Sequence, residues 1–219
     1  MAPFELGFED WSVIPLVDEE LTPQAVRLES DAAQFYVVPE FLSPGECNQI
    51  IRAINLGLTP SEVTSGEGYW RTSRTCHIPD VAPRLAQAID ICLSDLTGID
   101  PSYAEPLQGQ RYDVDQYFKA HHDWFQPNSE EYFKHCTVGG QRTWTAMVYL
   151  NDVLEGGETD FPSLGFTVTP MPGLALVWNN LHPDGTPNYA TLHESLPVKQ
   201  GSKYIITKWY RAQPGRHKP

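Results

Sequence analysis

The sequence is poor in cysteine, and its few cysteines do not form closely spaced pairs. Its 219 residues include four of them, Cys47, Cys76, Cys92 and Cys136, and none belongs to a CxxC pair. A zinc ribbon needs such pairs, and four widely separated cysteines in a chain of this length are not typical of a disulfide framework, so both are disfavoured. We therefore expect reduced thiols. Cys92 falls on an apolar helical stripe, and we expect it to lie in the core.

Basic residues and long apolar runs are also scarce. The chain has 15 Lys and Arg against 28 Asp and Glu, a formal net charge of −13. This argues against electrostatic binding to nucleic acid, which needs clustered cations. No apolar run approaches the roughly 20 residues of a membrane helix. The segment 1–18 has no basic start followed by an apolar stretch, so we expect no signal peptide and a cytoplasmic location.

The first half of the chain carries helical signals. We treat residues 1–34 as an acidic lead-in segment and residues 35–219 as one domain, which opens with a short strand at 35–38. Ser43-Pro44-Gly45-Glu46 has the pattern of a capping box with proline at the first helical position. It predicts a helix that ends near Gly57.

A second helix is predicted over residues 81–96, where Leu85, Ile89, Cys92 and Leu96 follow helical spacing and Gly98 provides a stop.

After residue 104 the pattern changes to short alternating or aromatic-rich runs separated by turn residues. These runs cover residues 107–112, 117–123, 143–150, 166–169, 174–178, 192–198 and 204–210. The segment 151–157, with its Gly156-Gly157 pair, is predicted to be a hairpin turn. About seven strands after two helices predict an α+β, mainly β fold, either a helix-backed antiparallel sandwich or a jelly roll.

The densest group of potential metal ligands is His121-His122-Asp123. Side chains two apart on a strand share a face, so His121 and Asp123 can point into a barrel together while His122 faces away. A third ligand from a distant strand would complete two histidines and one carboxylate, a facial set that suits non-haem iron(II). The remaining histidines are the candidates for that ligand: His77, His135, His182, His193 and His217. On this spacing alone, structural histidines remain an alternative.

His193 lies near the start of a predicted strand, and the next strand carries Lys203 after a turn at Gly201. A cation at that position can face the metal pocket and bind the far end of a dicarboxylate.

Several characteristic blocks lie between about residue 37 and residue 211. They are Leu42–Cys47, Arg71-Thr72-Ser73, Glu105–Gln108 with Arg111-Tyr112, Gln116–Asp123, Gly139–Thr143 with Tyr149–Asp152, Glu155–Thr159, and His193–Val198 with Gly201–Lys203 and Thr207–Trp209. In these blocks the chain resembles the prolyl 4-hydroxylase type of 2-oxoglutarate-dependent oxygenase. The ten-residue step from His193 to Lys203 matches the family's step from distal metal ligand to co-substrate lysine.

This resemblance implies a double-stranded β-helix, the jelly-roll or cupin-like fold, backed by N-terminal helices. It implies that His121, Asp123 and His193 form the catalytic iron(II) site and that 2-oxoglutarate and oxygen are co-substrates. Lys203 would bind the outer carboxylate of 2-oxoglutarate, helped by the hydroxyls of Tyr112 and Thr159. L-ascorbate would serve as reductant. Because related halogenases lack the carboxylate that Asp123 provides, hydroxylation is the implied reaction.

The resemblance further implies a groove for a proline-containing peptide or protein. Its lining residues would be Arg71, Ser73, Glu105, Phe118 and Arg142, with Trp178 as the pocket wall. Phe118 stands where relatives often have tyrosine, and Asp115 replaces a glycine in the turn before the ligand strand.

Three other functions are weighed against this one. The same chemistry could act on a free amino acid or another small molecule, which a small closed pocket would favour over an ordered peptide-covering loop at Tyr69-Trp70-Arg71. A cupin-like metal-binding or sensing module without turnover has no use for Lys203. A nucleic-acid demethylase is disfavoured by the acidity of the chain.

Overall fold

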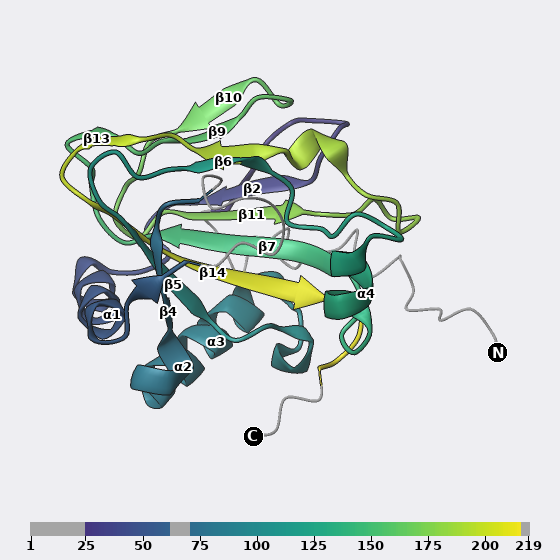
Figure 1. Cartoon of the computed structure of the whole chain (residues 1–219), viewed down its shortest axis with the longest axis horizontal. Coiled ribbons are helices and arrows are strands. Elements are labelled where there is room, and N and C mark those ends of the chain that lie inside the picture. The colour runs from purple at the N-terminus through teal and green to yellow at the C-terminus, as the bar shows by residue number, and fades with distance from the viewer. Residues whose placement is uncertain (1–24, 62–70, 216–219) are drawn as a thin grey trace.

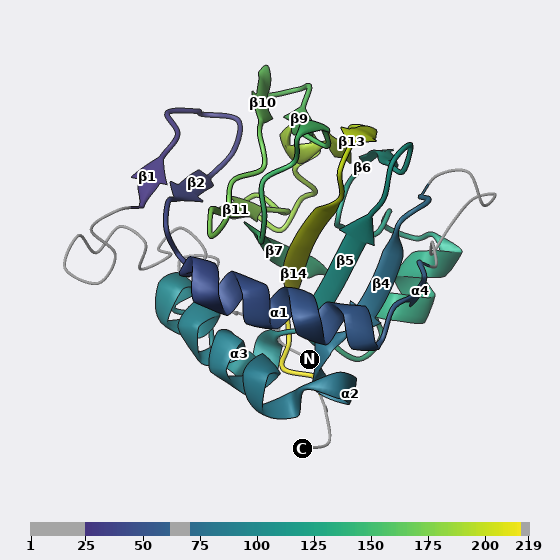
Figure 2. The same cartoon turned by 90° about the vertical axis from the view of Figure 1, so that its left-hand side faces the viewer.

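Two antiparallel sheets face each other and form the framework of the protein (Figures 1 and 2). The computed structural model describes residues 25–61 and 71–215. The larger sheet consists, in spatial order, of β1 (Val26–Arg27), β2 (Phe35–Val38), β11 (Ala175–Asn179), β7 (Arg142–Tyr149), β14 (Lys203–Arg211), β5 (Gln108–Tyr112), β4 (Arg74–His77) and β3 (Thr59–Pro60). The smaller sheet consists of β10 (Phe166–Val168), β9 (Thr159–Phe161), β12 (His193–Ser195) and β6 (Phe118–His121). A short ladder joins β8 (Glu155–Gly156) to β13 (Val198–Gln200). This is the expected jelly-roll arrangement.

Side-chain alternation along β7 divides the core into two layers. Trp144, Ala146 and Val148 belong to the cluster that packs on the helices, whereas Met147 and Tyr149 belong to the cluster between the two sheets. A strand that is buried on both faces in this way carries a nearly continuous apolar run, which the buried Thr145 interrupts here. The functional pocket lies in the layer between the sheets.

Helices cover the outer face of the larger sheet (Figure 2). The first, α1 (Pro44–Leu56), begins with the predicted capping box. The Ser43 backbone N–H donates to Glu46 Oε2 at 2.8 Å, and the Glu46 backbone N–H donates to Ser43 Oγ at 3.3 Å. Gly57 ends the helix, as its position predicted.

The second predicted helix is confirmed with a start two residues later, but its buried face differs from the prediction at Cys92. A short helix, α2 (Ile78–Val81), precedes α3 (Pro83–Thr97), which ends at Gly98 in the left-handed conformation. Cys92 is exposed, so its placement in the core was wrong. Leu93, one position further and about 100° around the helix, takes the buried place instead. The buried residues of α3 are Ala86, Ile89, Leu93, Leu96 and Thr97.

The predicted hairpin turn at residues 151–157 is also wrong. Strand β7, which precedes it, pairs with β11 and β14, whereas β8 pairs with β13 and β9 pairs with β10 and β12. The chain therefore crosses from the larger sheet to the smaller one here. A Gly-Gly pair signals a turn, but it does not determine which strands the turn connects.

Several elements had no clear sequence signal. They are β1, β3, β4, β9, the two 3-10 turns Pro101–Tyr103 and Tyr189–Thr191, and the helix α4 (Glu130–Cys136) at one end of the larger sheet (Figure 1). The end of the lead-in segment joins the sheet, since Val26 pairs with Val37. Among the described residues, no helix has both the length and the apolar character needed to cross a bilayer.

Candidate metal centre and dicarboxylate pocket

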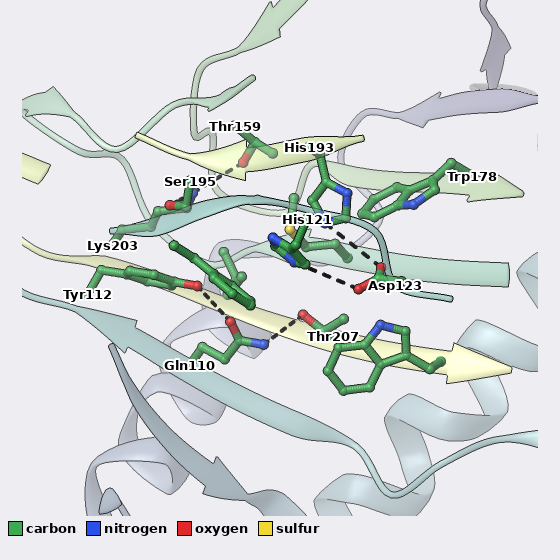
Figure 3. Close-up of a pocket in the computed structure, with 14 residues that line it drawn as sticks. Gln110, Tyr112, His121, Asp123, Thr159, Trp178, His193, Ser195, Lys203 and Thr207 are labelled. Carbon is green, nitrogen blue, oxygen red and sulfur yellow. Dashed lines mark hydrogen bonds and ion pairs between the residues drawn. The ribbon is translucent and has the colours of Figure 1, made fainter. Parts of the chain in front are cut away.

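Three side chains converge between the sheets in the way their spacing predicted (Figure 3). His121 ends β6 and His193 begins β12, and the two residues lie directly opposite each other in the antiparallel ladder. Asp123 follows two residues after His121. Asp123 Oδ1 lies 3.9 Å from His121 Nε2, and Asp123 Oδ2 lies 3.9 Å from His193 Nε2. One ligand atom from each residue falls within 4.8 Å of the other two.

Backbone carbonyl groups fix the tautomers of both histidines. His121 Nδ1 lies 2.8 Å from the Lys119 carbonyl oxygen, and His193 Nδ1 lies 3.0 Å from the Thr191 carbonyl oxygen. Because a carbonyl only accepts, each Nδ1 carries the proton and each Nε2 presents its lone pair toward Asp123. Burial and the neighbouring His193 lower the pKa of His121 to about 3, which keeps this imidazole neutral.

Asp123 is buried and held as a carboxylate. Burial opposes ionisation, but the positive charge of Arg142 and the hydrogen bond from the Thr145 hydroxyl favour it, and the pKa of Asp123 lies below the ordinary value. Thr145 Oγ1 donates to Asp123 Oδ2 at 2.6 Å. Two imidazole nitrogens and one carboxylate on one side of a cavity are the donor set of a facial iron(II) site. The residues present therefore fit the implied metal.

The other histidines that the structure describes take no part in this cluster. His122 faces away, as strand alternation predicted: its Nε2 lies 3.3 Å from the Tyr189 carbonyl oxygen and its ring packs on Trp124. His135 stacks on Phe125. His77 is exposed and His182 half-buried, while His217 lies outside the described residues.

A buried cation lines the same pocket. Lys203 is fully buried, and its Nζ donates to Ser195 Oγ at 2.9 Å and to Thr159 Oγ1 at 3.2 Å. Burial lowers the pKa of Lys203 to about 7. No carboxylate lies within ion-pair distance of its Nζ among the described residues, so the ammonium group can accept an acidic ligand.

Tyr112 lines the pocket beside Lys203, but its hydroxyl hydrogen is already used. The hydroxyl donates to Gln110 Oε1 at 2.9 Å, and Gln110 Nε2 donates onward to Thr207 Oγ1 at 3.2 Å (Figure 3). Lys203 Nζ lies 5.4 Å from the centre of the Tyr112 ring, within cation–π range.

Phe118 and Trp178 form aromatic walls around the histidines. The Phe118 ring stacks on His121 with 3.6 Å between ring centres, and Trp178 makes an edge contact with His193 at 5.0 Å. The indole N–H of Trp178 has no acceptor among the described residues. It therefore offers a free donor at the pocket wall.

Arg71 and Ser73 lie at the edge of the site. The Arg71 guanidinium lies 4.9 Å over the Phe118 ring, and its Nε donates to Ser73 Oγ at 2.7 Å. Residues 69 and 70 lie outside the described part of the chain, so the predicted covering loop is represented only from Arg71 onward.

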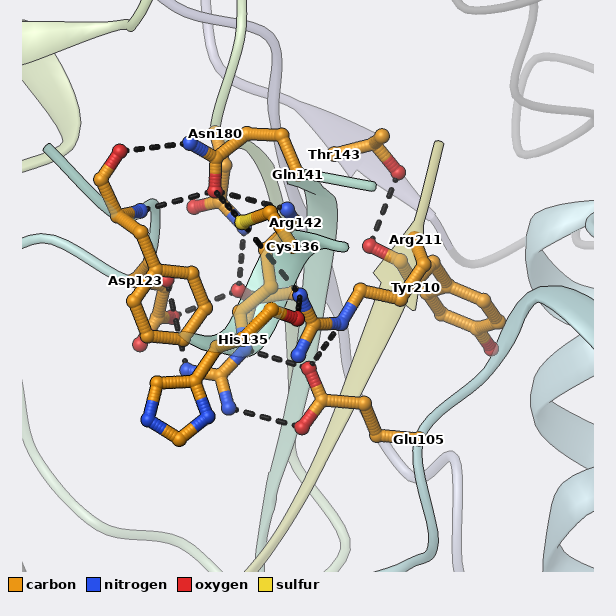
Figure 4. Close-up of polar contacts among 12 residues, drawn as sticks. Glu105, Asp123, His135, Cys136, Gln141, Arg142, Thr143, Asn180, Tyr210 and Arg211 are labelled. Carbon is orange, nitrogen blue, oxygen red and sulfur yellow. Dashed lines mark hydrogen bonds and ion pairs between the residues drawn. The ribbon is translucent and has the colours of Figure 1, made fainter. Parts of the chain in front are cut away.

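Glu105 and Arg142 form an ion pair behind Asp123 and are not among the residues that line the pocket (Figure 4). Arg142 Nη1 reaches the Asp123 carbonyl oxygen at 3.4 Å, and Arg211 Nε contacts Glu105 Oε1 at 2.6 Å. Their contact with a substrate remains a prediction.

Sequence reasoning missed several residues that line the pocket: Gln110, Met147, Ser195, Ile205, Thr207 and Trp209. Most of them lie an even number of residues away, along the same strand, from a pocket residue that the sequence had predicted. Gln110 is two residues before Tyr112 on β5, and Ile205 and Thr207 follow Lys203 by two and four on β14. Strand alternation from those positions would have found them.

Comparisons with known proteins agree with this geometry. Residues 107–211 match the model of the 2OG-Fe(II) oxygenase superfamily. The chain is 34% identical to prolyl 4-hydroxylase subunit alpha-1 of Gallus gallus over 142 residues, which are 64% of this chain and 27% of that subunit. It thus spans about a quarter of that relative's length. It is 30% identical to the probable prolyl 4-hydroxylase 4 of Arabidopsis thaliana, covering 86% of this chain and 71% of that protein.

A solved structure has the same framework. The viral collagen prolyl hydroxylase of Paramecium bursaria Chlorella virus-1, in complex with 2-oxoglutarate, superposes with a TM-score of 0.62 at 30% identity. The match covers 81% of this chain and 96% of that one.

Proposed function

This chain belongs to the prolyl 4-hydroxylase type of the 2OG-Fe(II) oxygenase superfamily, and from that premise we propose that it hydroxylates a proline residue in a peptide or protein. The co-substrates are 2-oxoglutarate and oxygen, and the products include succinate and carbon dioxide. One observation carries the proposal. The ligand set His121, Asp123 and His193 lines the same pocket as the buried cation Lys203, so one cavity offers donors for a metal and a cation for a distal carboxylate.

Bound iron(II) would supply the activation of oxygen that an unreactive C–H bond requires. The protein's own residues hold and orient the reactants. His121, Asp123 and His193 would hold the metal from one side, while Lys203 and Thr159 would bind the outer carboxylate of 2-oxoglutarate. The surrounding walls, chiefly Phe118, Trp178 and Met147, limit the access of water to the centre. Because Asp123 supplies a carboxylate ligand, the site supports hydroxylation rather than halide transfer.

The peptide or protein substrate is supported by the relatives' names and by the position of Arg71 above Phe118 at the edge of the site. Phe118 brings no hydroxyl group to that edge, so the substrate meets an apolar ring there. Ascorbate as reductant is proposed from the family resemblance.

The test is mass spectrometry of proline-rich peptides and host-cell proteins after incubation with iron(II), 2-oxoglutarate, ascorbate and air. The Asp123→Ala variant serves as the control because it lacks one metal ligand. We expect one added oxygen atom on proline with the wild-type protein and none with the variant. Fragment spectra and hydrolysis followed by chromatography would show whether the product is 4-hydroxyproline.

Two other outcomes would redirect the proposal. Succinate formation without modified proline would indicate a free amino acid or another small molecule as the substrate. Absence of both succinate and hydroxyproline would overturn the enzymatic function and favour a metal-binding module.

A further inference from the structure

Ser195 lies in the pocket in a position that the metal site alone does not explain. It ends β12 directly opposite Thr159 of β9, so the two hydroxyl groups are cross-strand neighbours on one face of the smaller sheet. Lys203 reaches the same point from β14 of the larger sheet. All three side chains are buried, with 8%, 2% and 0% of their surface exposed, respectively. Figure 3 shows the three polar ends gathered at one end of the pocket.

Three hydrogen-bond donors are free at this point: the third N–H of Lys203 and the hydroxyl groups of Ser195 and Thr159. An ammonium group has three N–H donors, and Lys203 gives one to Ser195 and one to Thr159. Thr159 also accepts from the Tyr149 hydroxyl at 2.7 Å. Both Ser195 and Thr159 therefore use oxygen lone pairs in these contacts, and neither has an acceptor for its own proton among the described residues.

A carboxylate matches this arrangement. It is an acceptor with about four lone-pair sites, and three converging donors, one of them charged, would satisfy most of them. By contrast, Tyr112 gives its hydroxyl hydrogen to Gln110. In the conformation described, Ser195 is therefore better placed than Tyr112 to supply the third donor.

We propose that Ser195 donates a hydrogen bond to the distal carboxylate of the dicarboxylic co-substrate, and that with Lys203 and Thr159 it sets the length of 2-oxo acid that the pocket takes. This inference rests on the proposed function, because it assigns a role within the same co-substrate pocket. Substitution of Ser195 should therefore change the affinity for 2-oxo acids that carry a distal carboxylate. It should not change the contribution of the 2-oxo acid end, which would face the metal.

The experiment is isothermal titration calorimetry on the full chain loaded with Ni(II), which permits binding without turnover. Two ligands of equal chain length are compared: 2-oxoglutarate, and 2-oxopentanoate, which lacks the distal carboxylate. For Ser195→Ala we expect the Kd of 2-oxoglutarate to rise about 10- to 100-fold, the range for a lost hydrogen bond to a charged group. The Kd of 2-oxopentanoate should change by less than about twofold, since that ligand makes no such bond.

Further variants separate a direct contact from a structural effect. Ser195→Cys keeps a weak donor of similar size, so it should give a smaller loss than Ser195→Ala and provides a folded comparison if the alanine variant unfolds. Thr167→Ala removes an exposed hydroxyl from the same sheet, on β10, and should leave both Kd values unchanged. Ser195→Ala should also narrow the preference for 2-oxoglutarate over 2-oxoadipate, because the loss of the hydroxyl makes room for one more methylene group.

An equal loss of affinity for both five-carbon ligands would overturn the proposal, because it would mean that Ser195 only supports the pocket. Unchanged binding of 2-oxoglutarate would overturn it as well. If the wild-type Ni(II) protein binds neither ligand, the proposed function fails together with this inference. If the wild type binds 2-oxoglutarate but no proline is hydroxylated in the activity assay, only the substrate assignment fails.

Discussion

Arg142 donates from Nε and Nη2 to the two carboxylate oxygens of Glu105, at 2.6 and 2.8 Å, in a bidentate ion pair (Figure 4). The pair is largely shielded from water, with side chains only 16% and 18% exposed. Arg142 also lies 4.0 Å over the Trp209 ring and donates to the Asp123 carbonyl oxygen. The ion pair therefore supports both a pocket wall and the backbone of a metal-ligand residue.

Glu105→Ala should lower the free energy of unfolding by about 3 to 5 kcal/mol, because it leaves the buried charges of Arg142 and Arg211 without their partner. Glu105→Gln keeps one acceptor oxygen and should cost less. Urea denaturation followed by tryptophan fluorescence measures both. Glu130→Gln, on the exposed side of α4, is the matched control and should change stability by no more than about 0.5 kcal/mol. A loss below about 1 kcal/mol for Glu105→Ala would show that the pair is effectively solvated.

Metal binding should stabilise the wild-type protein but not Asp123→Asn. A divalent ion at 100 times its Kd adds about 2.7 kcal/mol by mass action, which thermal unfolding with and without Mn(II) would detect. The variant also removes a carboxylate whose lowered pKa shows that the folded protein stabilises its charge, so without metal it should be less stable than the wild type at neutral pH. An equal metal-induced rise in Tm for both proteins would place the ion elsewhere.

Binding of 2-oxoglutarate should weaken as pH rises above 7. The pKa of Lys203 in the free protein is about 7 because of burial, and a bound carboxylate raises it. The ammonium form of Lys203 therefore predominates below pH 7 and is progressively lost above it. Above it, the complex must take up a proton, so the Kd should rise toward tenfold per pH unit.

Calorimetry in two buffers of different ionisation enthalpy, between pH 6 and pH 9, measures this proton uptake directly. Lys203→Arg should bind more weakly but without the pH dependence, because an arginine stays charged over this range. A flat pH profile for the wild-type protein would contradict the prediction.

Gly173→Ala should be much more destabilising than Gly165→Ala. Both glycines have positive φ, at +77° and +73°, so alanine is strained at either position. A Cβ at Gly173 would also lie 2.0 Å from the Leu42 carbonyl oxygen, whereas a Cβ at Gly165 would meet nothing within 4 Å. We expect about 1 kcal/mol at Gly165 and roughly 3 kcal/mol at Gly173 from urea denaturation. Equal losses would mean that the Leu42 segment moves aside.

The predictable parts of this fold are those with a strong local signal. The capping box of Ser43 and Glu46 predicted α1 because the two hydrogen bonds depend on residues three apart. The pair His121 and Asp123 was found because strand alternation places them on one face. Pairing between distant strands has no such local signal, which is why the crossover at residues 151–157 was mistaken for a hairpin.

The same reasoning explains why Ser195 was missed as a pocket residue. A serine near the end of a strand resembles an ordinary turn residue, and its importance comes from Thr159 across the ladder and Lys203 on the other sheet.

The error at Cys92 concerns which side of the helix α3 is buried. The sequence pattern indicated an amphipathic helix, but the precise contact line was set by how α3 packs on the sheet.

The position of Cys92 gives the protein a natural attachment point for a reporter group. Cys47, Cys76 and Cys136 are buried, whereas Cys92 is exposed on α3. This helix belongs to the layer on the far side of the larger sheet from the pocket (Figure 2). A thiol-reactive dye can therefore be attached selectively to the native sequence, and the labelled protein can follow ligand capture at a distance from the reacting groups.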